Sequence, residues 1–224
     1  MSFLLNENHS QIGGSMTDSK IRIRHMNQSD VKRVVDIHLQ VFEGFFLSFL
    51  GPCFLTALYS AIVDDPTGIS ILADDEQIVY GFAVGTTEAS GFYRRLIMHK
   101  LWKFSVASIR PVLKNPRILP RLLRAFSMPH DAALPDGWGL LMSIGVLSNE
   151  QNKGIGSLLM GAFLDEATQR GLKKIYLTTD KYNNDKVNAF YQKIGFRCDT
   201  TFVTPEGRWL NEFIIDLPIS KITR

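Results

Sequence analysis

The sequence GLLMSIGVLSNEQNKGIGSLLMGAFLDEATQRG, Gly139 to Gly171, combines three kinds of segment in one run. Residues 140–147 are an apolar stretch, residues 148–150 form a polar turn, and the residues after Gly156 favour a helix up to the last glycine. The first N–H groups of a helix have no partners within it, and the helix dipole favours negative charge there. Gly154 and Gly156 allow a bulky anion to approach the backbone closely. The run therefore predicts a strand, a loop and a helix that together bind a pyrophosphate.

The segments that follow narrow the interpretation. Lys174–Thr179 (KIYLTT) predicts a short strand, and Asn184–Ile194 (NDKVNAFYQKI) predicts a helix that Gly195-Phe196 closes. A Gln-x-x-Gly-x-Gly loop followed by Asn-x-x-x-x-x-x-Tyr-x-x-x-Gly-Phe resembles the GNAT superfamily of acyl-CoA-dependent N-acetyltransferases. The resemblance is specific over residues 140–196, looser over 21–86 and 197–216, and fails over 91–133.

The rest of the chain fits the layout that this resemblance implies. Residues 21–26 (IRIRHM) alternate as a half-buried strand does, and Ser29 and Asp30 are able to cap a helix running to about Phe42. A second helix is expected from Pro52, a hairpin over 69–73 and 78–86, and a closing antiparallel pair over 196–203 and 209–217. We therefore expect an α/β chain with the GNAT fold, a mixed and mostly antiparallel central sheet flanked by helices. A basic helical insertion is expected between the third and fourth strands.

Length and composition agree with one domain. The chain has 224 residues, of which 45% are hydrophobic, and a net charge of +3, which argues against a nucleic-acid partner. We expect a flexible leader over 1–20, which does not look like a signal peptide, and a single GNAT domain over 21–219 with the insertion at 91–133. Cys53 and Cys198 fit no metal spacing and favour reduced thiols in a cytoplasmic protein. The uncharged stretch 44–63 is long enough to be considered as a membrane span. Gly51-Pro52 interrupts it, however, and favours a loop and a buried helix.

The resemblance implies acetyl-CoA as co-substrate and assigns residues to it. The backbones of Ile144 and Val146 would lie along the pantetheine arm, beside Gly145, which is either a strand bulge or a packing glycine. Asn184 and Asn188, four apart on one helix face, would bind CoA amides or phosphate, unless they are a cap and a surface amide. The remaining cofactor-binding residues are those of the loop, Gln151, Asn152, Lys153, Gly154, Ile155, Gly156 and Ser157.

The resemblance also makes Tyr191 the catalytic residue. It matches the family tyrosine whose hydroxyl reaches the CoA sulfur, where a phenol is a workable acid for the leaving thiolate. The alternative is a core aromatic on an amphipathic helix. No general base is evident from the sequence, and a water chain stays open beside five candidate side chains: Glu43, Glu88, His130, Asp131 and Asp136.

The acceptor is a small-molecule amine in this interpretation. The aromatic loop Phe42–Phe46 would lie on the acceptor side, which makes Glu43, Phe45 and Phe46 substrate residues. The FEGFFLSFLGP segment and the basic insertion resemble acetyltransferases of bacterial surface-polysaccharide pathways, which act on amino sugars.

The insertion carries nine Lys or Arg and no Asp or Glu over residues 91–130, with apolar residues between them. Such a segment is able to contact an anionic membrane, here the inner membrane surface, or an anionic acceptor. A lid or a homodimer arm with solvated charges is the alternative.

Two other functions compete with the acetyltransferase. A nicotinamide dehydrogenase would use Asp180 as its ribose-binding acid, but Leu159 stands where the third glycine of Gly-x-Gly-x-x-Gly belongs. A non-catalytic GNAT-fold module that binds acyl-CoA for regulation stays open, and Tyr191 argues against it.

Overall fold

The structure is a computed structural model that describes residues 21–88, Phe92, Arg95 and 135–218. The predicted leader, nearly all of the basic insertion, and the candidate bases His130 and Asp131 lie outside the described residues. The expectations of membrane contact and of a dimer arm through 91–130 therefore stay predictions.

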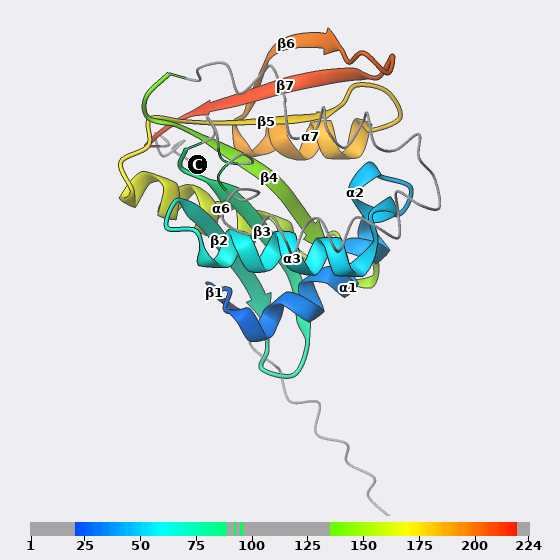
Figure 1. Ribbon diagram of the computed structural model, residues 1–224. Coiled ribbons are helices and arrows are strands. Elements are labelled where there is room, and N and C mark those ends of the chain that lie inside the picture. Colours follow the sequence, from blue (N-terminus) through cyan, green and yellow to red (C-terminus); the bar gives the residue numbers. More distant parts are fainter. Residues whose placement is uncertain (1–20, 89–91, 93–94, 96–134, 219–224) are drawn as a thin grey trace, which may run out of the picture.

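Seven strands form one sheet (Figure 1). The strands are β1 (Arg22–His25), β2 (Gly68–Asp74), β3 (Val79–Thr86), β4 (Trp138–Val146), β5 (Lys174–Asp180), β6 (Arg197–Val203) and β7 (Trp209–Asp216). Their order is β1-β2-β3-β4-β5-β7-β6, and every neighbouring pair is antiparallel except β4 with β5. The expected mixed, mostly antiparallel sheet is confirmed.

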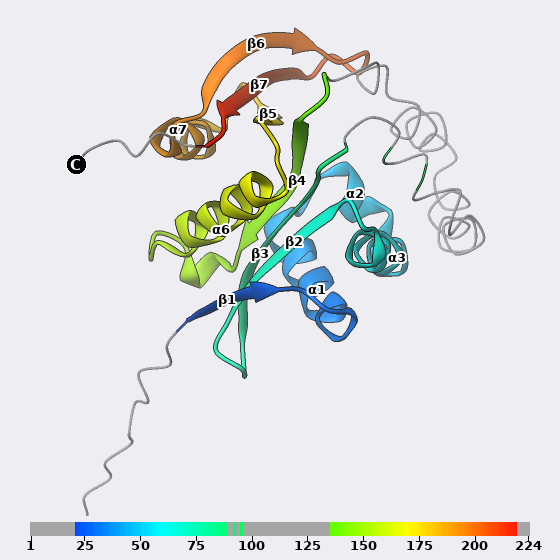
Figure 2. The same ribbon diagram turned by 90° about the vertical axis from the view of Figure 1, so that its left-hand side faces the viewer.

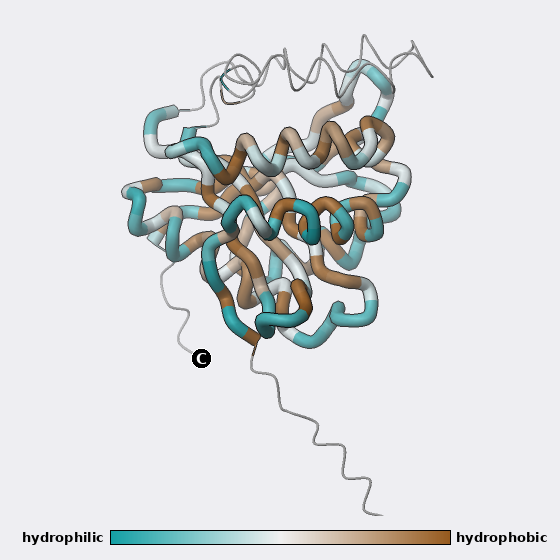
Figure 3. Tube along the Cα trace, turned by 60° about the horizontal axis from the view of Figure 1, so that its bottom comes forward, coloured by the Kyte–Doolittle hydropathy of each residue, from teal (hydrophilic) through white to brown (hydrophobic). Residues whose placement is uncertain are grey.

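Helices cover both faces of this sheet (Figure 2). The helices are α1 (Val31–Val41), α2 (Phe46–Phe49), α3 (Gly51–Asp64), α6 (Ile155–Gln169) and α7 (Asp185–Ile194), with short 3-10 turns η1 (Gln28–Asp30) and η3 (Ser148–Glu150). One face carries α1, α2 and α3, and the other carries α6 and α7. Figure 3 shows the apolar residues gathered along the strands and the helices over them, with hydrophilic residues in the connections.

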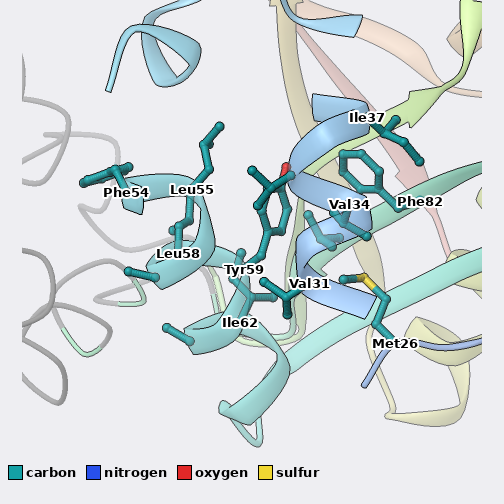
Figure 4. Close-up of a cluster of buried hydrophobic side chains, with 14 of the residues drawn as sticks. Met26, Val31, Val34, Ile37, Phe54, Leu55, Leu58, Tyr59, Ile62 and Phe82 are labelled. Carbon is teal, nitrogen blue, oxygen red and sulfur yellow. The ribbon is translucent and has the colours of Figure 1, made fainter. Parts of the chain in front are cut away.

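Each face has its own apolar core. On the α1 and α3 face, Tyr59 of α3 points toward α1, among Val31, Val34 and Ile37 (Figure 4). On the other face, α6 and α7 pack on β2 to β5 and β7 around fully buried Phe163 and Phe213. The central strands β2 and β3 are buried on both faces, so they form the interior of the sheet.

The start of α1 differs from the expected cap. Asn27 caps the 3-10 turn that precedes α1, because its side chain accepts from the Ser29 N–H at 2.9 Å, whereas Asp30 occupies the N-cap position of α1 without a side-chain cap bond. The Asp30 carboxylate accepts from the Asn27 N–H at 2.9 Å in return, which completes a capping box. A 3-10 turn then leads into the helix.

The uncharged stretch 44–63 forms two helices. The short α2 occupies the expected loop, and α3 begins at Gly51 with Pro52 in its first turn. Within the described residues, no helix has both the length and the apolar character that a membrane crossing requires.

Strand β4 leaves its neighbour β5 soon after it begins. The two strands pair only at Trp138, Gly139 and Leu140, opposite Lys174, Ile175 and Tyr176. Beyond these positions they diverge, as Figure 1 shows, while β4 stays paired with β3 as far as Val146. The sheet therefore opens between its two halves toward the ends of β4 and β5.

The bulge of β4 lies at Met142 and not at Gly145. Val84 pairs with Ser143 and Gly85 pairs with Leu141, so one residue of β4 is extra. Gly145 pairs regularly with Phe82, and a Cβ there would lie 3.1 Å from the Phe82 ring and 3.3 Å from the Phe42 ring. Of the two readings of this glycine, the structure supports the packing glycine.

Candidate active site

The end of β4, the following loop and the start of α6 lie at the opening between β4 and β5. Gly154 caps α6 with φ +85°, and Leu158 makes the first helical turn by donating to the Gly154 carbonyl at 3.1 Å. The N–H groups of Ile155, Gly156 and Ser157 precede this bond, so they have no acceptor within the helix. They are available to an anion.

The loop leaves room for that anion. A Cβ on Gly154 would meet no atom within 4 Å, whereas a Cβ on Gly156 would lie 3.4 Å from the Phe190 ring of α7. Asn152 also has positive φ, 65°, so two of the three residues before α6 adopt the left-handed conformation. The structure thus leaves open space beside Gly154, whereas Gly156 lies where α6 packs against Phe190 of α7.

The polar side chains of the loop make local contacts. The Gln151 amide donates to the Val146 carbonyl at 3.3 Å, which fastens the loop to the end of β4. The Lys153 ammonium lies 3.0 Å from the Glu150 carboxylate. Lys153 remains more than half exposed, so an exposed pair of this kind yields easily to a competing anion.

The two asparagines of α7 face the end of β5. Asn184 donates to the Thr179 hydroxyl and to the Asp180 carbonyl, the latter at 3.3 Å, and Asn188 donates to the same carbonyl at 3.2 Å. Asn184 occupies the helix cap position without a side-chain cap bond, and Asn188 is half-buried, not a surface amide. The Asn188 Oδ1 is buried and has no hydrogen-bond partner among the described residues. It is an acceptor available to an N–H of a ligand.

Tyr191 lies deeper in the same helix. Its ring packs against Phe190, Phe196 and Phe213 with centroid separations of 5.4, 5.6 and 5.9 Å. Its phenol is protonated at neutral pH, where burial raises the pKa further above its usual value of about 10. The ring thus fills the core role that was the alternative interpretation of this residue.

Of the described base candidates, one lies toward the opening. Glu43 is exposed in the turn after α1, two residues before Phe45. Glu88 follows β3 and is paired with Arg95 at 3.1 Å, and Asp136 precedes β4. Both belong to the end where β4 and β5 are still paired, so the structure does not bring them to the opening.

A buried polar pair next to the Phe42–Phe46 loop was not predicted. The His38 Nδ1 and the Tyr59 hydroxyl share a hydrogen bond of 2.7 Å, and the His38 ring lies 4.7 Å from that of Phe42. Burial lowers the pKa of His38 to about 4, so the imidazole is neutral at neutral pH. Its Nε2 has no hydrogen-bond partner in the part of the chain that the structure describes. The position of His38 on the apolar side of α1 was the only signal in the sequence.

A second unpredicted group joins three distant segments. The Arg208 guanidinium holds the Asp180 carboxylate through contacts of 2.7 to 3.2 Å and lies 5.9 Å from the ring of Phe45. Phe45 is half-exposed at the start of α2, and the side chain of Phe46 is not described. The Asp180 carboxylate is therefore paired with an arginine of the β6–β7 connection.

Comparison with known proteins identifies this arrangement. The model of the acetyltransferase (GNAT) family matches residues 39–196. No curated protein matches the chain.

Solved structures share the fold at low sequence identity. The ribosomal-protein-S18-alanine N-acetyltransferase of Escherichia coli is 13% identical with a TM-score of 0.55, over 92% of this chain and 99% of its own. The yncA protein of Salmonella typhimurium, solved with its cofactor acetyl-CoA, is 13% identical with a TM-score of 0.54, over 92% and 98%. Aminoglycoside 6'-acetyltransferase type Ii is 15% identical with a TM-score of 0.56, over 87% and 96%. The family match covers most of the chain, and the solved structures share its overall fold. The chain therefore belongs to the GNAT family of acetyltransferases, which use acetyl-CoA as co-substrate.

Proposed function

We propose that the protein transfers the acetyl group of acetyl-CoA to a primary amine of a small molecule, and that this molecule is an amino sugar. The observation that carries the proposal is the opening between β4 and β5, which ends at the glycine-capped start of α6. Acetyl-CoA supplies an acyl group that is already activated as a thioester. The protein therefore has to orient the amine, accept its proton, and stabilise or protonate the leaving thiolate.

The described residues fit this co-substrate. The Gln151–Ser157 loop would hold the pyrophosphate through the N–H groups that precede the first helical bond. The backbone of Ile144 and Val146 would line the pantetheine arm, and the unpartnered Oδ1 of Asn188 would accept one of its amide N–H groups. Asn184 fixes the start of α7 against β5.

Tyr191 would act as general acid. A phenol is protonated at neutral pH, and a positioned hydroxyl is able to donate a hydrogen bond or a proton to the departing sulfur. On the acceptor side, Glu43, a water chain, and His130 and Asp131 outside the described residues remain the routes by which the amine would lose its proton. Phe45 would contact the acceptor from the α2 side.

The amino sugar is favoured by the acceptor loop. Phe42–Phe46 carries aromatic rings and one carboxylate, which suits a small ring-shaped molecule better than an extended basic peptide. Among the structural neighbours, one is named for an aminoglycoside and another for a ribosomal protein, so the shared fold leaves the acceptor open.

A thiol-release assay tests the proposal. Acetyl-CoA is supplied with amino sugars, aminoglycosides, polyamines and peptide N-termini in turn, and we expect release of free thiol above background with the amino sugars. The competing function, a regulatory module that holds acyl-CoA without turnover, is favoured by the burial of the Tyr191 ring in the core. Binding of acetyl-CoA by calorimetry with no thiol release for any amine would establish that module instead.

A further inference from the structure

We infer that Phe45, Asp180 and Arg208 form the subsite that recognises the ring and hydroxyl groups of the acceptor, and that its ligand is a hydroxyl-bearing amino sugar without phosphate or carboxylate groups. The inference rests on the proposed acetyl transfer and names the residues that select its second substrate. The three residues lie far apart in the sequence. Phe45 precedes α2, Asp180 is the last residue of β5, and Arg208 precedes β7.

The register of the sheet assigns the three residues to one face. Phe213 and Ile215 of β7 pack with Tyr191 on the α7 face, so residues of even number in β7 point to the opposite face. Asp180 pairs directly with Leu210 and therefore shares that opposite face. This is the face of α1 and α2, where Phe45 lies, and the N-termini of α6 and α7 belong to the other.

The same three residues span the opening of the sheet. Phe45 precedes α2 on the β1 to β4 side, while Asp180 and Arg208 belong to the β5 to β7 side. The Arg208 guanidinium carbon lies 5.9 Å from the centroid of the Phe45 ring, so the two sides meet here. An acceptor that reaches the opening from this face passes these groups first.

The hydrogen-bonding capacity of the ion pair is only partly used. Arg208 contacts Asp180 through Nε at 3.2 Å and through Nη2 at 2.7 and 2.8 Å, and its Nη1 donates to no described residue. A guanidinium has five N–H donors, and a carboxylate accepts about four hydrogen bonds. Side-chain exposures of 40% for Arg208 and 27% for Asp180 leave the remaining sites open to a ligand.

The charge balance selects the class of ligand. Asp180 neutralises Arg208, so the pair offers donors and acceptors without a net charge that would attract a phosphate or a carboxylate. A half-exposed ion pair of this kind adds little to stability, so its donors and acceptors are not needed for the fold. Phe45, 45% exposed, adds an apolar ring face beside them. A saturated ring with hydroxyl groups meets all three features, because its C–H face packs on the aromatic ring while its hydroxyls donate and accept.

Variants of the subsite test the inference in the full-length protein. We expect Arg208→Met and Phe45→Leu each to raise the KM for glucosamine or galactosamine by about tenfold or more, the cost of a lost hydrogen bond or ring contact, with kcat changed much less. The KM for acetyl-CoA should stay unchanged. Arg208→Lys keeps the charge but loses the planar fork, so it should raise the acceptor KM as well. Arg197→Met is the matched control, because Arg197 pairs with Asp216 at the other end of β7.

A comparison of acceptors separates this inference from the proposed function. Cyclohexylamine has a ring and an amine but no other hydrogen-bonding group, so the wild type should prefer the amino sugars over it, and Arg208→Met should reduce that preference. Equal use of the two amines, an unchanged acceptor KM in Arg208→Met, or a preference for phosphorylated sugars would overturn the subsite while acetyl transfer stands. No thiol release with any amine would overturn both.

Discussion

At the scale of single residues, Tyr191 combines two roles that use different parts of one side chain. Its ring belongs to the aromatic core, and its hydroxyl is protonated at neutral pH, where burial raises the pKa of the phenol further above its usual value of about 10. We predict that Tyr191→Phe retains acetyl-CoA affinity in calorimetry but lowers kcat in the thiol-release assay by about 10²–10⁴-fold, the usual contribution of a positioned general acid.

The control for this change is Tyr182→Phe. Tyr182 is 59% exposed in the loop between β5 and α7, so loss of its hydroxyl should leave turnover unchanged. A Tyr191→Phe variant as fast as the wild type would show that the tyrosine is structural or that the thiolate leaves unaided.

His38 should make stability depend on pH. Its pKa is about 4 in the folded protein and near 6.5 when exposed, so the unfolded chain binds a proton first as the pH falls. Stability is therefore complete above pH 6.5 and decreases between 6.5 and 4, with about 2 kcal/mol lost by pH 5. Urea unfolding at pH 7 and pH 5 measures this loss, and His38→Gln should show a smaller one. An equal loss in wild type and variant would assign the dependence to other groups.

At the scale of elements, the two ends of α6 provide a matched test of the anion site. Gly154 and Gly171 both have positive φ, 85° and 80°, and a Cβ on either would meet no atom within 4 Å. Glutamate at either position therefore costs similar backbone strain, about 1–2 kcal/mol. We predict that Gly154→Glu weakens acetyl-CoA binding at least tenfold, about 1.4 kcal/mol, whereas Gly171→Glu leaves it unchanged. Calorimetry measures the acetyl-CoA affinity of both variants. Equal affinities would contradict the assignment of the 151–157 loop to the acetyl-CoA site.

Strand β1 is held to β2 by a partly buried ion-pair cluster. Burial works to raise the pKa of Asp74, but hydrogen bonds from Arg24 and Arg22 at 2.6 to 3.2 Å outweigh it and lower the pKa. We predict that Asp74→Asn destabilises the protein by about 2 kcal/mol at pH 7, since both arginines stay partly exposed.

Two urea-unfolding comparisons check this cluster. Asp216→Asn removes a carboxylate that bridges Lys174 and Arg197 at the surface, and it should change the midpoint little. The contribution of Asp74 is present at neutral pH and is lost below its usual pKa of about 3.8, as the carboxylate takes up its proton in the fold. Equal midpoints for the Asp74 and Asp216 variants would contradict the prediction.

The sequence predicts helices and strands well where the hydrophobic periodicity and the turn-forming residues indicate the same boundaries. The hairpin of β2 and β3 and the pair of β6 and β7 lie within two residues of their expected limits. The four-residue helix α2 was not predicted, because an aromatic run that short shows no helical periodicity. The bulge at Met142 was also not predicted. A glycine within a strand is the usual sign of a bulge, so the sequence pointed to Gly145, and a methionine inside an apolar run carries no such sign.

At the scale of the whole molecule, the sequence predicts the cofactor side better than the acceptor side. The loop 151–157 and the start of α7 are local motifs, so their spacing is visible in the chain. Phe45, Asp180 and Arg208 come together only through the strand order β4-β5-β7 and the reach of α2, and no local pattern links them. The same holds for His38 and Tyr59, which meet where α1 crosses α3.

The opening of the sheet also has a consequence for global stability. Strands β4 and β5 pair at only three positions, so β1 to β4 and β5 to β7 are held together mainly by the apolar core under α6 and α7. A ligand that contacts both the end of β4 and the face of α7 would bridge these halves. At a concentration of 100 times Kd it should stabilise the native state by about 2.7 kcal/mol.

For a chain of this length that free energy corresponds to a rise in Tm of about 5–10 °C, which calorimetric scanning with acetyl-CoA measures directly. The Gly154→Glu variant should show little or no rise at the same concentration, because it lacks the anion site that starts the bridge. Hydrogen exchange should slow on both sides of the opening, at residues 144–157 and 184–191, and remain unchanged in β1. Slowing confined to the loop alone would mean that the co-substrate binds one half of the sheet, and the Tm shift would then come from local ordering and not from a bridge.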